Sequence, residues 1–300
     1  MKALYETLLK ISDPDQLLKN EPMSAHTTFR VGGPADLMFF PKSVDQLRTA
    51  LEEAKARGID VLVMGNGSNM IVRDGGIRGL VIVLGERFAE IVVDGEMLTA
   101  QAGASMAKVA ATAQAAGLTG LEFISGIPGT LGGGCAMNAG AYGGQLSDAL
   151  VEAQVYMNGE VHTLTLDEMQ MGYRTTRPLR EGGIVLSARF ALRRGDKEEI
   201  MATMRDLNGR RRDKQPLNFP SAGSTFKRPE GYFAGALIEQ AGLKGTTIGG
   251  AQVSEKHAGF IINVGGASAA DILALIAHVQ SEVRRAFGVE LETEVRVIGE

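Results

Sequence analysis

Apolar residues in the first third of the chain follow a helical period and then a strand-like one. Ser43 opens a run with apolar residues every three or four positions, which predicts a helix that Ser43 caps and Gly58 ends. Short apolar runs at 60–65 and 79–85 predict buried strands, with the loop GNGSNM between them. A helix beside two such strands indicates a βαβ-like unit.

Two later segments alternate apolar and polar residues on either side of a turn. The first, 90–103, contains Asp94-Gly95, and the second, 151–166, contains Asn158-Gly159. These dipeptides favour the positive φ angles of two-residue hairpin turns, so both segments are predicted to be β-hairpins. The same patterns predict helices at 1–10, 105–116, 196–215, 233–241 and 268–287, and strands at 182–192 and 290–299.

Composition narrows the function classes. The net charge of −4, the 5% aromatic content and the absence of Trp argue against nucleic acid as the main partner. The single cysteine, Cys135, excludes a disulfide within the chain. The N-terminus lacks the features of a signal peptide, and no apolar run is long enough to span a bilayer, so we expect a cytoplasmic protein. We expect no metal, because the histidines show no ligand spacing: His26, His162, His257 and His278.

The segment SGIPGTLGGGCAMNAGAYGG, residues 125–144, is rich in glycine, and glycine has a high entropic cost on folding. Together with GNGSNM it suggests bare backbone held against an anion. A pair of tight turns would also account for both segments. A Rossmann site is disfavoured because Asn69 replaces the third glycine, although Glu86 lies where a ribose-binding acid is expected. A P-loop is excluded, since neither segment has Gly-Lys-Ser/Thr. Two such segments favour one long ligand, such as a dinucleotide.

Longer motifs extend over nearly the whole chain, from about Asn20 to Gly299. In order and spacing they resemble the UDP-N-acetylenolpyruvoylglucosamine reductases, the MurB family of bacterial peptidoglycan synthesis. The short segment between Met171 and Ile184 is similar to the compact type (type II) of this family. The motifs are HTTFRVGGPADLMFFP, GNGSNMIVRDGG, GIPGTLGGGCAMNAGAYGG, GYRTTRP, SAGSTFKRP, AGLKG with IGGAQVSEKHAGFIINVG, and ELETEVRVIG.

The resemblance implies an α+β fold with a two-lobed FAD-binding domain of the vanillyl-alcohol-oxidase (PCMH) type and a C-terminal α+β substrate-binding domain. We place the lobes at 1–84 and 85–199 and the substrate domain at 200–300. FAD would be held non-covalently between the two glycine-rich segments. The expected cofactor contacts are Gly65, Asn66, Gly67, Ser68, Asn69, Gly129, Thr130, Gly132, Gly133, Gly134, Asn138 and Ala139.

The resemblance also implies an NADPH-dependent reduction. Hydride would pass from NADPH to FAD and then to the enolpyruvyl ether of UDP-N-acetylglucosamine, giving UDP-N-acetylmuramate for the cell wall. Arg174 would stabilise the enolate, helped by Glu294 in its protonated form, and Ser224 would protonate the carbanion. Lys214 is the candidate for the UDP diphosphate, and Arg211, Lys227 and His257 are further candidates for substrate contact.

Each of these residues also has an ordinary structural explanation. Ser224 could belong to a turn, Arg174 could be a solvated surface side chain, and Glu294 could face outward from a strand. The alternative enzyme is an FAD-dependent oxidase of the same fold that acts on another alcohol or sugar. The alternative outside the enzymes is a non-catalytic dinucleotide-binding module. No obligate protein partner, nucleic acid or membrane is expected.

Overall fold

The computed structural model describes all of residues 1–300, and contacts divide the chain into two compact units. Unit 1 contains Met1–Leu18, Met38–Asn66 and Leu80–Arg211, and unit 2 contains Lys19–Leu37, Gly67–Gly79 and Arg212–Glu300. The units are therefore discontinuous in sequence. The three consecutive ranges 1–84, 85–199 and 200–300 stay a prediction.

Unit 1 contains most of the helices and strands. Its helices are α1 (Lys2–Leu8), α2 (Val44–Ala56), α3 (Met106–Ala115), α4 (Leu131–Ala136), α5 (Leu166–Met169), α6 (Arg177–Glu181) and α7 (Lys197–Lys214), the last of which ends in unit 2. Its strands are β3 (Val61–Met64), β6 (Ile91–Asp94), β7 (Met97–Gln101), β8 (Leu118–Thr119), β9 (Gly140–Ala141), β10 (Gly144–Gln145), β11 (Leu150–Met157), β12 (Glu160–Thr165), β13 (Ile184–Ala191) and β14 (Arg193–Arg194).

Three strands contain residues of both units: β1 (Leu17–Pro22), β2 (Pro34–Phe39) and β5 (Ile77–Val83). With β3 they form a sheet of order β1-β2-β5-β3, in which β3 and β5 are parallel. Unit 2 also contains β4 (Met70–Val72), α8 (Ala234–Gln240), β15 (Thr247–Ile248), β16 (Ala251–Val253), β17 (Ile261–Asn263), α9 (Ala269–Phe287) and β18 (Arg296–Ile298).

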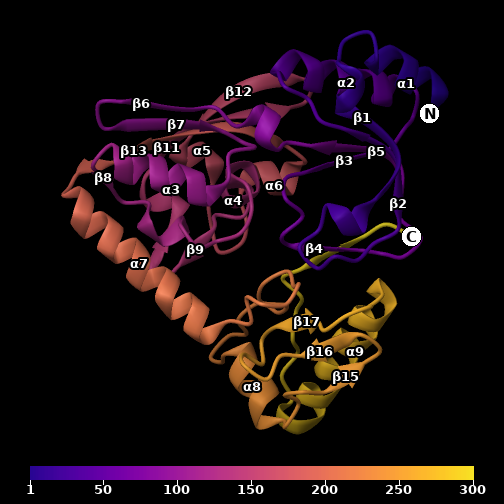
Figure 1. The fold of residues 1–300 in the computed structure, drawn as a ribbon, viewed down its shortest axis with the longest axis vertical. Coiled ribbons are helices and arrows are strands. Elements are labelled where there is room, and N and C mark those ends of the chain that lie inside the picture. Colours follow the sequence, from indigo (N-terminus) through magenta and orange to yellow (C-terminus); the bar gives the residue numbers. More distant parts are fainter. The chain divides into compact units, whose positions relative to one another are not determined.

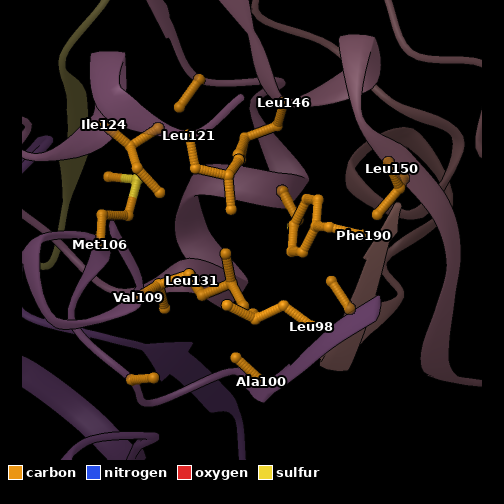
Figure 2. Close-up of a cluster of buried hydrophobic side chains, with 14 of the residues drawn as sticks. Leu98, Ala100, Met106, Val109, Leu121, Ile124, Leu131, Leu146, Leu150 and Phe190 are labelled. Atoms are coloured by element: carbon orange, nitrogen blue, oxygen red, sulfur yellow. The ribbon is translucent and has the colours of Figure 1, made fainter. Parts of the chain in front are cut away.

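The core of unit 1 lies under an antiparallel sheet of order β12-β11-β13-β7-β6, with α3 and α4 against one face (Figure 1). Figure 2 shows Leu98 of β7, Val109 of α3, Leu131 of α4 and Phe190 of β13 converging in this core, and all four are fully buried. Burial of such side chains stabilises the fold by roughly 1.5–3 kcal/mol each. The core therefore fixes α4 against the sheet.

The core of unit 2 forms around the antiparallel sheet β15-β16-β17 and helix α9. Ser268 caps α9 and forms a capping box with Asp271, as the helix predicted at 268–287 requires. Asp74, beyond β4, accepts from the amides of Ala269 (2.8 Å) and Ala270 (3.0 Å). A carboxylate at a helix N-terminus is stabilising, so Asp74 ties the segment after β4 to α9.

Most of the predicted helices and strands are confirmed, and the two hairpins differ at their turns. Asn158-Gly159 forms the second turn, with φ of 55° and 90°, as predicted. In the first hairpin Asp94 pairs with Met97, so the turn consists of Gly95 and Glu96. Among these two residues only Gly95 has a positive φ. Glycine at the first central position suits a type II′ turn. The turn therefore lies one residue later in the chain than the predicted Asp94-Gly95.

Two other predictions need correction. The strand predicted at 290–299 is only Arg296–Ile298, which pairs in parallel with β4. Before it, Glu292 accepts from the amide of Lys227 and Thr293 bridges to Phe226, so these residues bond elsewhere. The strands β1, β2 and β4 were not predicted. No helix is both long and apolar enough to cross a membrane.

The predicted glycine loop at 125–144 contains a helix, α4, despite its successive glycines. Glycine is unfavourable inside a helix, so close packing must compensate. A Cβ at Gly132 would lie 2.7 Å from Ala102 Cβ, and one at Gly134 would lie 2.7 Å from Met106 Sδ. A Cβ at Gly133 would meet nothing closer than 3.9 Å. Gly132 is therefore required for packing, Gly134 lies against the flexible side chain of Met106, and Gly133 lies on the open side.

We predict that Gly132→Ala lowers the free energy of unfolding by about 1–3 kcal/mol, because the added methyl overlaps Ala102. Gly133→Ala is the matched control, since the same methyl enters open space. Its higher helix propensity should leave stability unchanged or raise it by up to about 1 kcal/mol. Urea unfolding of the FAD-free variants measures both changes, and equal destabilisation by the two substitutions would contradict the packing argument.

Candidate functional site

The two glycine-rich segments meet at Gly65 and Thr130 within unit 1. A Cβ at Gly65 would lie 2.1 Å from Thr130 Oγ1, a distance that no side chain tolerates. Gly65 follows β3, and Thr130 is the buried N-cap residue of α4. The close approach of the Thr130 side chain to the backbone of residue 65 therefore requires glycine there. The following residues of the first segment, Gly67–Asn69, belong to unit 2.

The start of α4 offers fewer free amides than the sequence suggested. The amide of Leu131 donates to Ala104 O and that of Gly132 to Ala102 O, both at 2.8 Å. Gly133 is exposed, with a bare backbone on the open side of the helix. Bare backbone beside the Gly65–Thr130 contact fits an extended anionic cofactor such as a dinucleotide. Within this segment, Gly133 is the residue best suited to close approach.

Asn138 ends α4 in the left-handed conformation, with φ of 44°. The amide of Asn138 donates to Cys135 O and that of Ala139 to Gly134 O, the pattern of a Schellman motif. The buried Asn138 side chain accepts from the Ser147 amide at 3.1 Å and donates to Gln145 Oε1 at 3.2 Å. The same side-chain amide also donates to Gly172 O at 3.4 Å. Asn138 therefore has a structural function in this loop.

Arg174 lies in a tight turn in which Gly172 and Thr175 pair with each other. Its φ of 55° is uncommon for a residue with a side chain. The guanidinium lies over the ring of Tyr173, 5.2 Å from the ring centroid. Unusual backbone conformations of this kind concentrate at functional sites, where the surrounding structure supports them. The catalytic role of Arg174 stays a prediction.

Unit 2 brings Ser224, Glu294 and Asn69 together. The amide of Glu294 donates to the carbonyl of Thr225, next to Ser224, at 2.9 Å. The Asn69 side chain donates to Glu294 O at 3.2 Å, and Asn69 O accepts from the Arg296 amide at 3.1 Å. Glu294 therefore lies in a bend with both of its backbone polar groups bonded, and not in the strand expected from the sequence.

Comparisons with known proteins match the whole chain. Residues 215–298 match the model of the UDP-N-acetylenolpyruvoylglucosamine reductase C-terminal domain, and residues 35–165 match an FAD binding domain. The chain is 50% identical to the UDP-N-acetylenolpyruvoylglucosamine reductase of Alkaliphilus oremlandii, with 99% of this chain and 98% of the relative covered. It is 49% identical to the same enzyme of Clostridioides difficile, with the same coverage of both chains.

The chain belongs to the UDP-N-acetylenolpyruvoylglucosamine reductase family.

A solved structure of the Thermus caldophilus family member, 36% identical, superposes with a TM-score of 0.81 over 94% of this chain and 98% of that one. The predicted α+β fold, with an FAD-binding domain and a C-terminal reductase domain, is confirmed. An alkyldihydroxyacetonephosphate synthase, 18% identical, shares the fold over 65% of this chain with a TM-score of 0.51. FAD is therefore the cofactor of this family member.

Of the candidates for substrate contact in this family member, Lys227 and His257 already have partners. Lys227 Nζ lies 2.9 Å from Glu292 in an ion pair on the surface. His257 accepts from the Gly259 amide at Nδ1 (3.1 Å) and packs edge-on against Phe260. Burial, together with the nearby Lys244, lowers the pKa of His257 below its ordinary value. The structure thus gives both residues a structural explanation, and their substrate contacts stay predictions.

Arg211 differs from its neighbours on α7. It is partly buried against Gly126, and its Nε has no hydrogen-bond partner. Burial lowers the pKa of the Arg211 guanidinium from its ordinary value. A buried cation without a full set of partners is costly, which favours an anionic ligand at this position. Lys214, at the end of the helix, is exposed.

Cys135 is not a nucleophile in this structure. It lies fully buried in α4, and burial raises the pKa of the thiol to about 12. A buried thiol is inert because the reactive species is the thiolate. Two fully buried threonines, Thr176 and Thr225, were not among the residues predicted from the sequence. Thr176 could have been found from its position before Arg177-Pro178, since a threonine preceding proline is typical of a helix start.

We predict that His257 makes the protein less stable as the pH falls below about 6.5. The folded chain binds a proton at His257 less readily than the unfolded chain, because burial lowers the pKa. Below the unfolded pKa, proton uptake therefore favours unfolding. Urea unfolding between pH 5 and 8 should show a smaller loss of stability at low pH for His257→Asn than for the parent chain. An identical pH dependence would contradict the assignment.

Proposed function

We propose that this chain reduces the enolpyruvyl ether of UDP-N-acetylglucosamine to UDP-N-acetylmuramate with NADPH, through Arg174, Ser224 and Glu294. The best support is the match to reductases that are about 50% identical to this chain along its whole length. The models of the FAD binding domain and of the reductase C-terminal domain also match, one after the other along the chain. The relatives are named as reductases of this substrate, so an oxidase acting on another alcohol or sugar is not favoured. When bound, FAD supplies the hydride acceptor and donor between NADPH and substrate.

Arg174 is assigned to the substrate carboxylate. Hydride addition to the vinyl group places negative charge beside a carboxylate that is already anionic. A planar guanidinium matches a carboxylate with two parallel hydrogen bonds, and a preplaced cation needs no reorganisation as the charge develops. The left-handed turn at Arg174 supports this assignment, because it holds the start of the side chain in one direction.

Ser224 is assigned to the proton transfer. It is exposed and follows Gly223, at which an added Cβ would meet nothing within 4 Å. A hydroxyl is a weak acid in water, but a carbanion is a strong base, so transfer is favourable at hydrogen-bond distance. Glu294 is assigned to the enolate as a hydrogen-bond donor. The link from its amide to Thr225 supports a shared site for Glu294 and Ser224.

The nucleotide contacts are proposed for Lys214 and Arg211. An exposed ammonium can meet a diphosphate as a point charge. The unpartnered Nε of Arg211 would gain the hydrogen bond that it lacks. For the cofactor, we propose contacts at the segments Gly65–Asn69 and Gly129–Ala139. Within the second segment, the exposed backbone of Gly133 leaves the most room for close approach.

The cellular setting also stays a proposal. We infer that the protein acts in the cytoplasm and needs no obligate protein partner, nucleic acid or membrane. Fluorescence microscopy of a tagged chain in its bacterial host tests the location. Co-purification of the tagged chain with a stoichiometric partner would contradict independent function.

We predict that Ser224→Ala separates the two half-reactions. The rate of flavin reduction by NADPH should remain within about twofold of the parent rate, since no proton is delivered to carbon in that step. Oxidation of the reduced flavin by the enolpyruvyl sugar should fall by about 100-fold or more, the order of magnitude of a lost general acid. Anaerobic stopped-flow absorbance at the flavin band measures both rates.

Ser221→Ala is the control for this prediction, because it removes a nearby hydroxyl of the same type and leaves Ser224 in place. An equal loss in both half-reactions of Ser224→Ala would refute the role of Ser224 as proton donor.

A further inference from the structure

Thr176 holds the turn of Arg174 from one side. Its side chain is fully buried, and Oγ1 donates to the carbonyl of Ala136, the last residue of α4, at 2.8 Å. The same oxygen accepts from the Leu179 amide at 3.3 Å and caps α6. Thr176 stands only two residues after Arg174. Its hydroxyl therefore ties the end of the turn to the end of α4.

Asn138 holds the turn from the other side. The side-chain amide of Asn138 donates to the carbonyl of Gly172, where the turn begins, at 3.4 Å. The Asn138 side chain is itself held by bonds to Ser147 and Gln145, which lie outside the turn. The chain from Gly172 to Thr176 is thus attached at both ends to the residues that close α4.

The turn contains few backbone hydrogen bonds of its own. The amide of Gly172 donates to Thr175 O at 2.9 Å, and the reverse bond is 3.4 Å long. Tyr173 is 61% exposed, so it does not anchor the turn in a core. A left-handed Arg174 is less stable than the usual conformation and persists only where neighbouring contacts impose it.

We propose that Thr176, assisted by Asn138, is a positioning residue that holds Arg174 in its catalytic direction for reduction of the enolpyruvyl substrate. The inference rests on the proposed function of Arg174. Helix α4 is the fixed support, because Gly132 and Gly134 pack it closely against Ala102 and Met106. The glycine motif thereby acts on the substrate step as well as on the cofactor.

The test compares Thr176→Val, Thr176→Ser and Thr165→Val. Valine keeps the shape of threonine and removes the hydroxyl, whereas serine keeps the hydroxyl. Thr165→Val is the matched control: Thr165 also caps a short helix, α5, by accepting from its third amide, and its hydroxyl bonds to Glu168. FAD content, thermal midpoint and the two half-reaction rates are measured for each holoenzyme.

We expect Thr176→Val to slow oxidation of the reduced flavin by the enolpyruvyl sugar by about 10- to 100-fold, the effect of a small misplacement of a catalytic group. Flavin reduction by NADPH should stay within about twofold of the parent rate. Thr176→Ser should restore oxidation to within a few fold, and Thr165→Val should affect neither rate. Equal rates for Thr176→Val and the parent would overturn the proposal.

Combination with Arg174→Ala separates positioning from general loss of structure. If Thr176 acts through Arg174, Thr176→Val should slow the Arg174→Ala enzyme less than twofold. A full 10- to 100-fold further loss in that background would overturn the proposal. If Thr176→Val does not fold, Thr176→Ala takes its place, since alanine also removes the hydroxyl that bonds Ala136 and adds no atom to the buried position.

Failure of the proposed function gives a different result. If the parent enzyme is reduced by NADPH but is not reoxidised by the enolpyruvyl sugar, the proposed function is wrong and the Thr176 comparison has no basis. If the parent enzyme turns over and Thr176→Val turns over equally fast, the proposed function stands and the positioning role is refuted.

Discussion

The contact of α4 with the sheet of unit 1 is the constraint on which the candidate site depends. Gly132 allows the backbone of α4 to approach Ala102 more closely than any other residue would, and Gly134 packs against Met106. Gly133 keeps the opposite side of the helix bare. The entropic cost of successive glycines is thus offset by packing on one side, while the other side remains open to a cofactor. One short helix therefore serves both stability and binding.

The two candidate catalytic segments are held in a similar way, each within its own unit. In unit 1 the Arg174 turn is bonded to the end of α4 through Thr176 and Asn138. In unit 2 the backbone of Glu294 is bonded to Asn69 and Thr225. In both cases an asparagine of a glycine-rich segment bonds the backbone of a segment that carries a candidate catalytic residue. These asparagines contribute through position, which their residue type alone does not reveal.

Periodicity predicted the elements whose pattern is local. The cap at Ser43, the helix at 268–287 and the turn at Asn158-Gly159 depend on neighbouring residues only, and the structure has them as expected. The glycine segment was predicted as a loop because helix propensity disfavours α4, and tertiary packing overrides that preference. The observed strand is shorter than the one predicted at 290–299, because residues before Arg296 bond to Lys227 and Phe226, which lie far away in the sequence.

The candidate catalytic residues could be predicted from the amino-acid sequence only through the family motifs. The residue types of Arg174, Ser224 and Glu294 are each common on ordinary surfaces, and no spacing links them. The left-handed φ of Arg174 and the buried bond of Thr176 are tertiary features that no local pattern encodes. Family membership supplied the chemistry, and the structure supplied the contacts that hold it.

An anaerobic visible spectrum of the purified protein tests the central claim, a flavin that transfers hydride from NADPH to an enolpyruvyl UDP-sugar. The spectrum is recorded alone, after NADPH, and after UDP-N-acetylglucosamine-enolpyruvate. The account predicts a flavin band that bleaches with NADPH and returns when the enolpyruvyl sugar is added. A band that bleaches and does not return would contradict the substrate, and the absence of any flavin band, even after addition of FAD, would contradict the cofactor site itself.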